Sequence, residues 1–156
     1  MFKRCLAIIL ALFLLFSISC AKDDSENTGS GKEPDKDVEK ITIGVSVPLT
    51  GGSAEQGTRT LRGVTLAVEE FNASNVLEGI EVVIESQDDT AAPQESATIA
   101  NRFMANENII AVIGYTQSSC ALAAAPIMNE GKLVQICTFS SNVKISDAGP
   151  YTFRVL

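Results

Sequence analysis

The feature of this sequence that most constrains its fold is a regular alternation of short apolar runs with longer segments of helical periodicity. The run IIAVIG at 109–114 is short and continuous, which is typical of a strand buried on both faces of a sheet. Between 54 and 73 the apolar residues are spaced as on one face of a helix, at Leu61, Val64, Val68 and Phe71. Strands that alternate with helices over short loops form a parallel sheet with helices on both faces, so we predict an α/β fold.

The same patterns place the other elements of this fold. Pro93 opens a second helix at an early position, where its missing N–H costs nothing, and Gly131 marks the end of a third helix. The second helix has an apolar side made of Ala97, Ala100, Phe103 and Met104. The expected strands are 41–47, 80–88, 109–114, 132–137 and 151–156, and the expected helices are 54–73, one that begins at Pro93, and 118–129.

Residues 1–19 have the organisation of a signal peptide. Lys3 and Arg4 are positively charged, and the apolar run LAIILALFLLF follows at 6–16. A helix that spans a membrane needs about twenty apolar residues, so this run has the length of a signal-peptide core instead. We therefore expect the chain to be exported.

The residues after the apolar run leave two routes of cleavage open. Cys20 follows SIS and precedes a polar segment, which resembles the lipobox of bacterial lipoproteins, where the cysteine carries the lipid. Ser17 and Ser19 would equally suit ordinary signal peptidase. We favour a lipid anchor at Cys20, because a lone cysteine before a tether has no other role. Residues 20–40 are charged and rich in small residues, so we expect a disordered tether there and a folded domain at 41–156.

Charge and composition exclude several classes of function. The formal net charge is −7 with no basic stripe, which argues against a nucleic-acid partner. The chain has no histidine, which removes the commonest general base, the Ser-His-Asp triad and most catalytic zinc sites. We therefore expect no enzymatic activity, no metal and no cofactor. Export permits a disulfide between Cys120 and Cys137, and the alternative is a pair of buried free thiols.

The segment VPLTGGSAEQG at 47–57 joins the first expected strand to the first expected helix. Gly52 and Gly57 have the spacing of a phosphate-binding P-loop, but Thr58 occupies the position of its lysine. The dinucleotide pattern G-x-G-x-x-G is absent as well. The segment is then either a turn that uses the conformational freedom of glycine or a binding loop of another kind.

An acidic pair, Asp88 and Asp89, follows the second expected strand. A receiver-type phosphorylation site would need such a pair after the first strand and a single aspartate after the third, where this sequence has Pro48 and Tyr115. We expect the pair to cap the next helix, beside Thr90.

Two loops at the expected carboxyl ends of strands are rich in hydroxyl groups. Ser118 and Ser119 precede an alanine-rich helix, and TFSS at 138–141 follows the next strand. Ligands of parallel sheets bind at such ends, beside a switch in strand order. Ser118 is either a helix cap or part of a site in which free N–H groups and the positive helix end hold a carboxylate. In the second case two adjacent strand ends would hold one small polar head group.

Five longer stretches carry a family resemblance: ITIGVSVPLTGGSAEQG, LRGVTLAVEEFNA, VVIESQDDTAAPQESATIANRFM, IIAVIGYTQSSCALAAAPI and GKLVQICTFSSN. In this order and spacing, from about 41 to 156, the sequence resembles the leucine/isoleucine/valine-binding proteins, the type I periplasmic solute-binding proteins of branched-chain amino-acid ABC transporters. The resemblance implies two Rossmann-like lobes that close on an amino acid across a hinge. It covers the N-terminal lobe only.

The resemblance also implies roles for individual residues. Ser118 aligns with the serine whose hydroxyl and helix hold the ligand carboxylate, with Ser119 beside it, and Ser141 aligns with a threonine that binds the same head group. Phe139 aligns with a position that uses its backbone. Gln56 aligns with an aromatic residue that packs on the ligand side chain of branched-chain binders, so its polarity departs from an aliphatic specificity.

Two further departures from the family concern the disulfide and the length. Ala91 and Gln117 occupy the positions of the family's disulfide cysteines. Family members have over twice the residues of this chain, so the resemblance implies an N-terminal fragment without the lobe that closes over the ligand. We expect residues 20–156 alone to bind amino acids weakly and to self-associate.

The function expected from the resemblance is that of the substrate-binding component of an ABC transporter. Its ligand would be a branched-chain amino acid or a related amino-acid-like solute, and its partners would be the permease subunits and, through Cys20, the membrane. The alternatives are a ligand-binding module of a sensory receptor and an amide- or urea-type solute binder, which share this lobe.

Overall fold

The computed structural model describes residues 38–155, which lie within one compact unit. The expected signal peptide (1–19), Cys20 and nearly all of the expected tether (20–40) lie outside the described residues. In the part that is described, no helix has both the length and the apolar character needed to cross a bilayer. The elements in chain order are β1 (Glu39–Val47), the 3-10 turn η1 (Gly51–Ser53), α2 (Ala54–Ser74), β2 (Ile80–Asp88), α3 (Pro93–Met104), β3 (Ile109–Gly114), α4 (Ser118–Glu130), β4 (Val134–Cys137), the 3-10 turn η2 (Val143–Ile145) and β5 (Thr152–Arg154).

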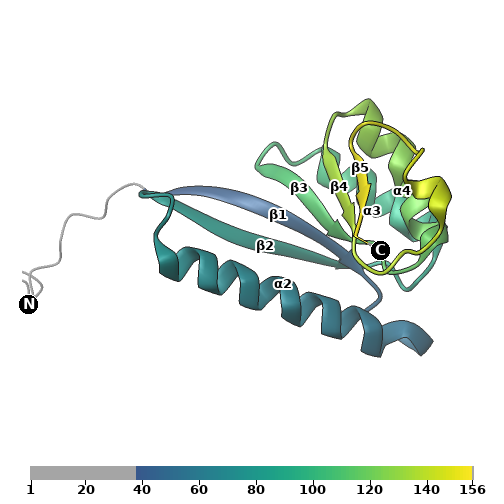
Figure 1. Cartoon of the computed structure of the whole chain (residues 1–156), viewed down its shortest axis with the longest axis horizontal. Helices are drawn as coiled ribbons and strands as arrows, with labels where there is room; N and C mark the ends of the chain where they lie inside the picture. Colours follow the sequence, from purple (N-terminus) through teal and green to yellow (C-terminus); the bar gives the residue numbers. More distant parts are fainter. Residues whose placement is uncertain (1–37, 156) are drawn as a thin grey trace, which may run out of the picture. The chain divides into compact units, whose positions relative to one another are not determined.

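The strands form one parallel sheet in the order β2-β1-β3-β4-β5 (Figure 1). The register places Val47 opposite Asp88 and Gly114 opposite Cys137, so these strands end at one common edge. The chain leaves β1 for β2 on one side and later crosses to β3 on the other, which puts a switch in strand order between β1 and β3. The predicted α/β fold with a parallel sheet is confirmed.

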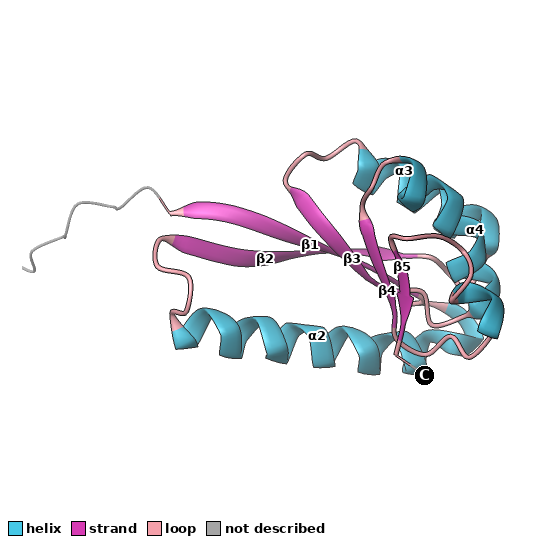
Figure 2. Cartoon of the chain, turned by 45° about the horizontal axis from the view of Figure 1, so that its top comes forward, coloured by secondary structure: helices cyan, strands magenta, loops and turns pink. Residues whose placement is uncertain are grey.

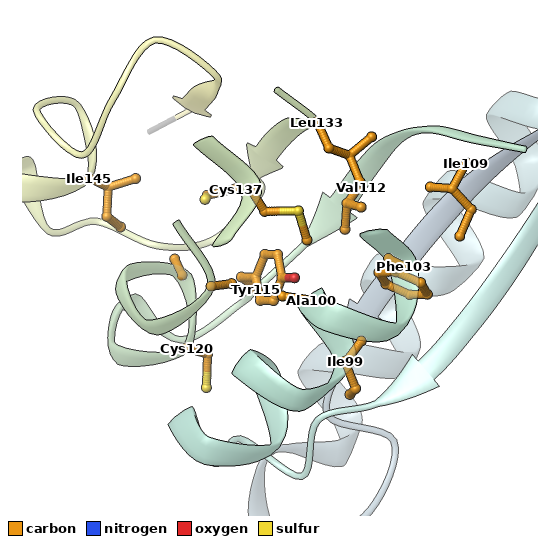
Figure 3. Packing of buried hydrophobic residues seen from close by; sticks show 13 residues of the cluster. Ile99, Ala100, Phe103, Ile109, Val112, Tyr115, Cys120, Leu133, Cys137 and Ile145 are labelled. Carbon is orange, nitrogen blue, oxygen red and sulfur yellow. The ribbon is translucent and has the colours of Figure 1, made fainter. Parts of the chain in front are cut away.

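The main core lies between the sheet and the helices α3 and α4. Tyr115 is completely buried within this cluster, near Ala100 and Cys137 (Figure 3). α3 packs closely on the sheet at Gly44 of β1, where a Cβ atom would lie 3.1 Å from the ring of Phe103 and would force that ring to shift. The expected apolar side of this helix is therefore the side that packs. The other members of the core are Ile99, Ile109, Val112, Cys120, Ala121, Ala124, Met128, Leu133 and Ile145.

The opposite face of the sheet is covered by α2 alone among the described helices (Figure 2). The expected apolar face of α2 does point toward the sheet, but Gly57 is its only buried residue. Between α2 and the sheet lies an apolar hollow of ≈ 700 Å³, lined by Val64, Val68 and Phe71 from the helix and by Ile43 and Ile113 from the strands. The two faces therefore differ, since one is tightly packed and the other is open.

Three strands have limits that differ from the sequence prediction. The expected strand 151–156 is shorter in the structure, where β5 covers only Thr152–Arg154. The starts of β1 and β4 differ for local reasons. β1 begins at Glu39, inside the expected tether, because the amide of Glu39 donates to the carbonyl of Gly79 at 2.9 Å and so extends the pairing with β2. β4 begins at Val134 and not at 132, because Lys132 adopts a left-handed conformation with φ of 57°. The amide of Leu133 then donates back to Met128 at 2.9 Å and closes the end of α4.

The two cysteines of the folded part are buried free thiols. Burial raises the pKa of Cys120 and of Cys137 above the usual thiol value. Gln135, also buried, donates a hydrogen bond from its side-chain nitrogen to Cys137 Sγ at 3.2 Å. Of the two alternatives for these cysteines, the structure has the free thiols.

Candidate functional site

The loops after β1, β3 and β4 meet at the carboxyl edge of the sheet, beside the switch in strand order. The amide of Tyr115 donates to the carbonyl of Ser46 at 2.7 Å, and the amide of Thr138 donates to the carbonyl of Gly114 at 3.0 Å. Gly114 has a φ of 139°, and a Cβ atom there would lie 2.1 Å from the carbonyl oxygen of Ser46. Only glycine therefore lets the ends of β1 and β3 approach this closely.

The glycines between β1 and α2 have identifiable structural roles. Gly51 has a φ of 75°, the left-handed conformation that turns the chain out of the strand. Gly57 lies in the first turns of α2, where a Cβ atom would stand 1.8 Å from the carbonyl oxygen of Pro48. The expected turn at 47–57 is thereby accounted for, and it delivers the first turn of α2 to the carboxyl edge.

Gln56 and Gln117 join two of these loops through their side chains. Gln117 Nε2 donates to Gln56 Oε1 at 3.1 Å, although the residues come from the loop after β3 and from the start of α2. Both side chains are half-buried. This amide pair spans the switch between β1 and β3, the place where parallel sheets hold their ligands.

Ser118 joins the loop after β3 to the loop after β4. The amide of Asn142 donates to Ser118 Oγ at 3.3 Å. The N-cap of α4 is Gln117, in an extended conformation with no side-chain cap, and Ser118 is the first residue of the helix. The expectation of a Ser118 helix cap is therefore wrong, because the chain enters α4 one residue earlier and the hydroxyl points to the neighbouring loop. Ser119 is exposed at the same helix end.

The loop after β4 is fixed by Ser140, a member of the expected hydroxyl loop at 138–141. Ser140 is buried, and its hydroxyl donates to the carbonyl of Tyr115, so it ties this loop to the end of β3. Ser141 is exposed, and its carbonyl accepts from Arg154 Nη1 at 3.4 Å. The side chain of Phe139 is also exposed, at 57%. A run of hydroxyl residues predicted the loop, but the sequence had no signal for which hydroxyl anchors it.

Gln56 and Phe139 line one small hollow at this edge. The hollow has a volume of ≈ 250 Å³ and is bounded by Glu55, Gln56, Arg59, Thr60 and Phe139. Arg59 forms an ion pair with Glu55 one helical turn earlier, and both side chains are mostly exposed. Of the predicted site residues, the structure brings Gln56 and Phe139 together in the hollow. It places Ser118, Ser119 and Ser141 at the same carboxyl edge, outside the residues that line it.

Asp88 holds the loop after β1, and neither member of the acidic pair caps α3. Asp88 accepts hydrogen bonds from the amide of Leu49 at 2.7 Å, the hydroxyl of Thr50 at 2.6 Å and the amide of Thr90 at 2.9 Å. The N-cap of α3 is Ala92, which has no side-chain cap. The expected cap is therefore wrong, because β2 ends level with β1 and turns Asp88 toward the neighbouring loop. The pairing of Val47 with Asp88 at the ends of β1 and β2 therefore explains why Asp88 contacts the loop after β1.

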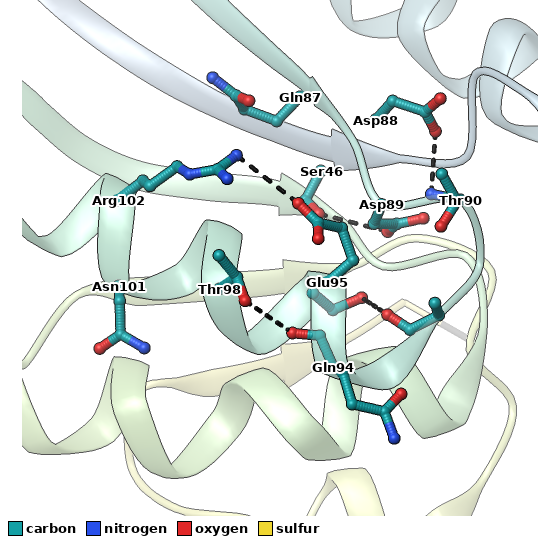
Figure 4. Close-up of polar contacts among 12 residues, drawn as sticks. Ser46, Gln87, Asp88, Asp89, Thr90, Gln94, Glu95, Thr98, Asn101 and Arg102 are labelled. Carbon is teal, nitrogen blue, oxygen red and sulfur yellow. Dashed lines mark hydrogen bonds and ion pairs between the residues drawn. The ribbon is translucent and has the colours of Figure 1, made fainter.

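Asp89 points the other way, into the protein (Figure 4). It is 1% exposed, accepts from Ser46 Oγ at 3.2 Å and accepts from the amide of Ala91 at 3.0 Å. Burial raises the pKa of Asp89 above its usual value. The slight burial of Asp88 also works against ionisation, but hydrogen bonds from Thr50, Leu49 and Thr90 outweigh it and lower the pKa of Asp88.

The described residues hold no cluster of three or more histidine, cysteine, aspartate or glutamate side chains suited to a metal ion. What the carboxyl edge offers instead is a helix N-terminus, hydroxyl groups, two amides and an aromatic ring. Such groups bind a small polar solute by hydrogen bonds and leave its covalent bonds unchanged.

Residues 40–156 match a family model described as "Periplasmic binding protein". The chain is 30% identical over 109 residues to an "Amino acid binding protein" of Pseudomonas aeruginosa, an alignment that covers 70% of this chain and 29% of that protein.

Two solved structures are similar in fold and sequence. An ABC transporter substrate-binding protein from Desulfitobacterium hafniense in complex with Leu has a TM-score of 0.65 and 30% identity, over 74% of this chain and 34% of that chain. A solute binding protein of an ABC transporter from Rhodopseudomonas palustris BisB5, in complex with 3,4-dihydroxybenzoic acid, has a TM-score of 0.67 and 25% identity, over 74% and 31%. The chain thus spans between 29% and 34% of the length of these three proteins.

Proposed function

This chain belongs to the periplasmic binding protein family, and on that basis we propose that it is the solute-binding component of an ABC transporter for a small amino-acid-like solute. Its parallel sheet and helices match the first lobe of solved periplasmic binding proteins. The family is non-enzymatic, as expected from the missing histidine and the absent nucleophile–base pair.

The observation that carries this proposal is the meeting of three loops at the carboxyl edge of the sheet, around the first turn of α4. The Ser118 hydroxyl lies between the loops after β3 and β4, where it accepts from Asn142. The first amides of a helix lack partners within the helix, and with its positive end they favour a carboxylate. We propose that Ser118, Ser119 and Ser141 bind the acidic head group of the solute.

We propose that Gln56 and Phe139 contact the rest of the solute. Both line the hollow beside the head-group loops. The relatives reported above include one in complex with leucine and one in complex with a dihydroxybenzoic acid, and both ligands are small carboxylic acids. A small carboxylic acid, whether a branched-chain amino acid or a related solute, is therefore the class to test first.

The family has an extracytoplasmic location, and we propose that this chain acts in the periplasm or at the cell surface. We further propose a signal peptide at 1–19, a disordered tether from residue 20 to the start of β1 at Glu39, and a lipid anchor at Cys20. ABC permease subunits are the proposed protein partners. Labelling with a radioactive fatty acid tests the anchor, since Cys20→Ala should lose the label that the unmutated chain acquires.

The binding proposal is tested by Ser118→Ala. In a version of the protein restored to two lobes, losing a hydrogen bond to a charged group costs about 1.5–3 kcal/mol, so affinity for the solute should fall roughly ten- to a hundredfold in isothermal titration. Ser74→Ala is the matched control, because Ser74 lies at the opposite end of α2 and bonds only the local carbonyl of Phe71. If Ser118→Ala lowers the melting temperature but leaves the affinity unchanged, the hydroxyl is structural and the proposed site is wrong.

A further inference from the structure

We infer that the solute is a small carboxylic acid whose far end carries an amide or a hydroxyl group, and not a purely aliphatic one. This inference rests on the proposed function, because it assumes that the head group lies at Ser118 and that the far end enters the hollow beside Gln56. The amide pair of Gln56 and Gln117 carries it.

The amide pair is held in place but is not saturated. Gln117 Nε2 donates to Gln56 Oε1, which fixes two side chains from different loops against each other. A primary amide offers two N–H hydrogens and one carbonyl oxygen, so one bond between two amides leaves a nitrogen donor on Gln56 and an oxygen acceptor on Gln117. Among the described residues, the structure records no partner for either atom.

The surroundings of Gln56 favour an uncharged polar occupant. The hollow of ≈ 250 Å³ is near the small end of the ligand sites of proteins, which span about 300–1,000 Å³. At its rim Glu55 and Arg59 pair with each other, so neither presents an uncompensated charge. The exposed ring of Phe139 supplies an apolar wall against which a flat amide or an aromatic ring packs.

An aliphatic far end would conflict with these amides. It would displace water from the free nitrogen donor of Gln56, the member of the pair that lines the hollow, without replacing the lost hydrogen bond. An unsatisfied buried polar group typically weakens a complex roughly tenfold to a hundredfold. An amide or hydroxyl of the same shape would make that hydrogen bond, so the site should distinguish between solutes that differ only in this group.

Pairs of solutes with matched shapes test this inference. Asparagine is compared with leucine, threonine with valine, and 4-hydroxybenzoate with 4-methylbenzoate, so that amino acids and aromatic acids form separate arms. The full chain is purified in its exported form and titrated with each solute, by calorimetry and by ligand-observed NMR for weak complexes. The polar member of at least one pair should bind roughly tenfold or more tightly than its aliphatic partner.

Variants of the amide pair identify the cause of any preference. Gln56→Leu should reduce the preference for the polar member at least severalfold. Gln117→Leu should also reduce it, because this change removes the hydrogen bond that holds the Gln56 amide in place. Gln94→Leu is the matched control, because it makes the same change at an exposed position of α3, on the opposite face of the sheet from α2 (Figure 2). This control should leave the preference unchanged.

The possible results separate the inference from the proposed function. Tighter binding of the aliphatic member in every pair overturns the inference and leaves the proposed function standing. A polar preference that survives both Gln56→Leu and Gln117→Leu also overturns it. Because this chain alone should bind only weakly, the decisive measurement is ligand-observed NMR. If it detects no binding of any of these solutes, the proposed function is contradicted and the inference fails with it.

Discussion

Asp88 and Asp89 are neighbours in sequence, yet their carboxylates are in opposite electrostatic environments. Asp88 faces the loop after β1 and accepts several hydrogen bonds, which lower its pKa despite slight burial. Asp89 faces the interior, where burial raises its pKa and the nearby charge of Asp88 adds to the effect. At the scale of single residues, the direction in which a carboxylate points decides whether its ionised form stabilises or destabilises the folded state.

Asp89→Asn should therefore change the pH dependence of stability. Because the folded-state pKa of Asp89 is raised above 3.8, its contribution is fully present below that pH and is lost as the pH rises through the raised value. Asparagine does not titrate, so the variant should gain stability relative to the unmutated chain as the pH rises above 3.8. Urea unfolding at several pH values measures the difference.

Asp88→Asn is the control for this experiment, because its sign is opposite. The lowered pKa of Asp88 makes a contribution that is present above 3.8 and is lost as the pH falls through the lower value. The Asp88→Asn variant should thus gain relative stability only in acid. Parallel pH profiles for the unmutated chain and Asp89→Asn would show that burial does not penalise the Asp89 charge.

At the scale of elements, the side chain of Asn72 ties α2 to the sheet in addition to the apolar contacts of the helix. Asn72 Nδ2 donates to the carbonyl of Val82 at 2.8 Å, and the amide of Val82 donates to Asn72 Oδ1 at 2.9 Å. β2 is an edge strand of the sheet, so the Asn72 amide occupies backbone groups that face away from β1. This contact holds the helix over the sheet although the hollow of ≈ 700 Å³ separates much of its apolar face from the strands.

Asn72→Ala should destabilise the domain by about 1–3 kcal/mol, because it leaves backbone groups of the buried residue Val82 without partners. Asn101→Ala is a suitable comparison, since Asn101 is exposed on α3 and bonds only the carbonyl of Ala97 in its own helix. That variant should change stability by less than about 0.5 kcal/mol. Chemical unfolding gives both values. Equal stability of the two variants would mean that α2 is held by apolar contact alone.

At the scale of the whole molecule, the two faces of the sheet differ in how much apolar surface they expose. On the α2 side Ile110 is 52% exposed and lines the apolar hollow. The register puts Phe153, also 52% exposed, in one row with Ile113 and Ile136. Apolar groups that are wholly or partly exposed on one sheet face favour association between molecules.

Residues 20–156 in isolation should therefore self-associate. Sedimentation velocity at increasing concentration should show species larger than the monomer. The double variant Ile110→Glu with Phe153→Glu should shift the distribution toward the monomer. Val76→Glu is the control, because Val76 is 68% exposed in the turn after α2, away from this row. A monomer at every concentration would contradict the prediction.

The sequence by itself determined the order, type and approximate limits of the elements. The pattern of apolar residues reflects which face of each element is buried, and this pattern is local in the sequence. It is seen in the spacing of Leu61, Val64, Val68 and Phe71 and in the continuous run at 109–114. The alternation of these elements then implied a parallel sheet with a carboxyl edge. The loops at that edge were therefore identified correctly from the segment 47–57, from Ser118 and Ser119, and from TFSS at 138–141.

The tertiary structure alone decided which atoms meet at that edge. The hydrogen bond between Gln56 and Gln117, the acceptance by Ser118 from Asn142, and the anchoring by Ser140 each join residues far apart in the chain. No local pattern encodes such pairs, because they depend on strand register and on where each helix begins. From the sequence, therefore, Ser118 was either a helix cap or part of a binding site. Its actual partner became apparent only when the neighbouring strand placed Asn142 beside it.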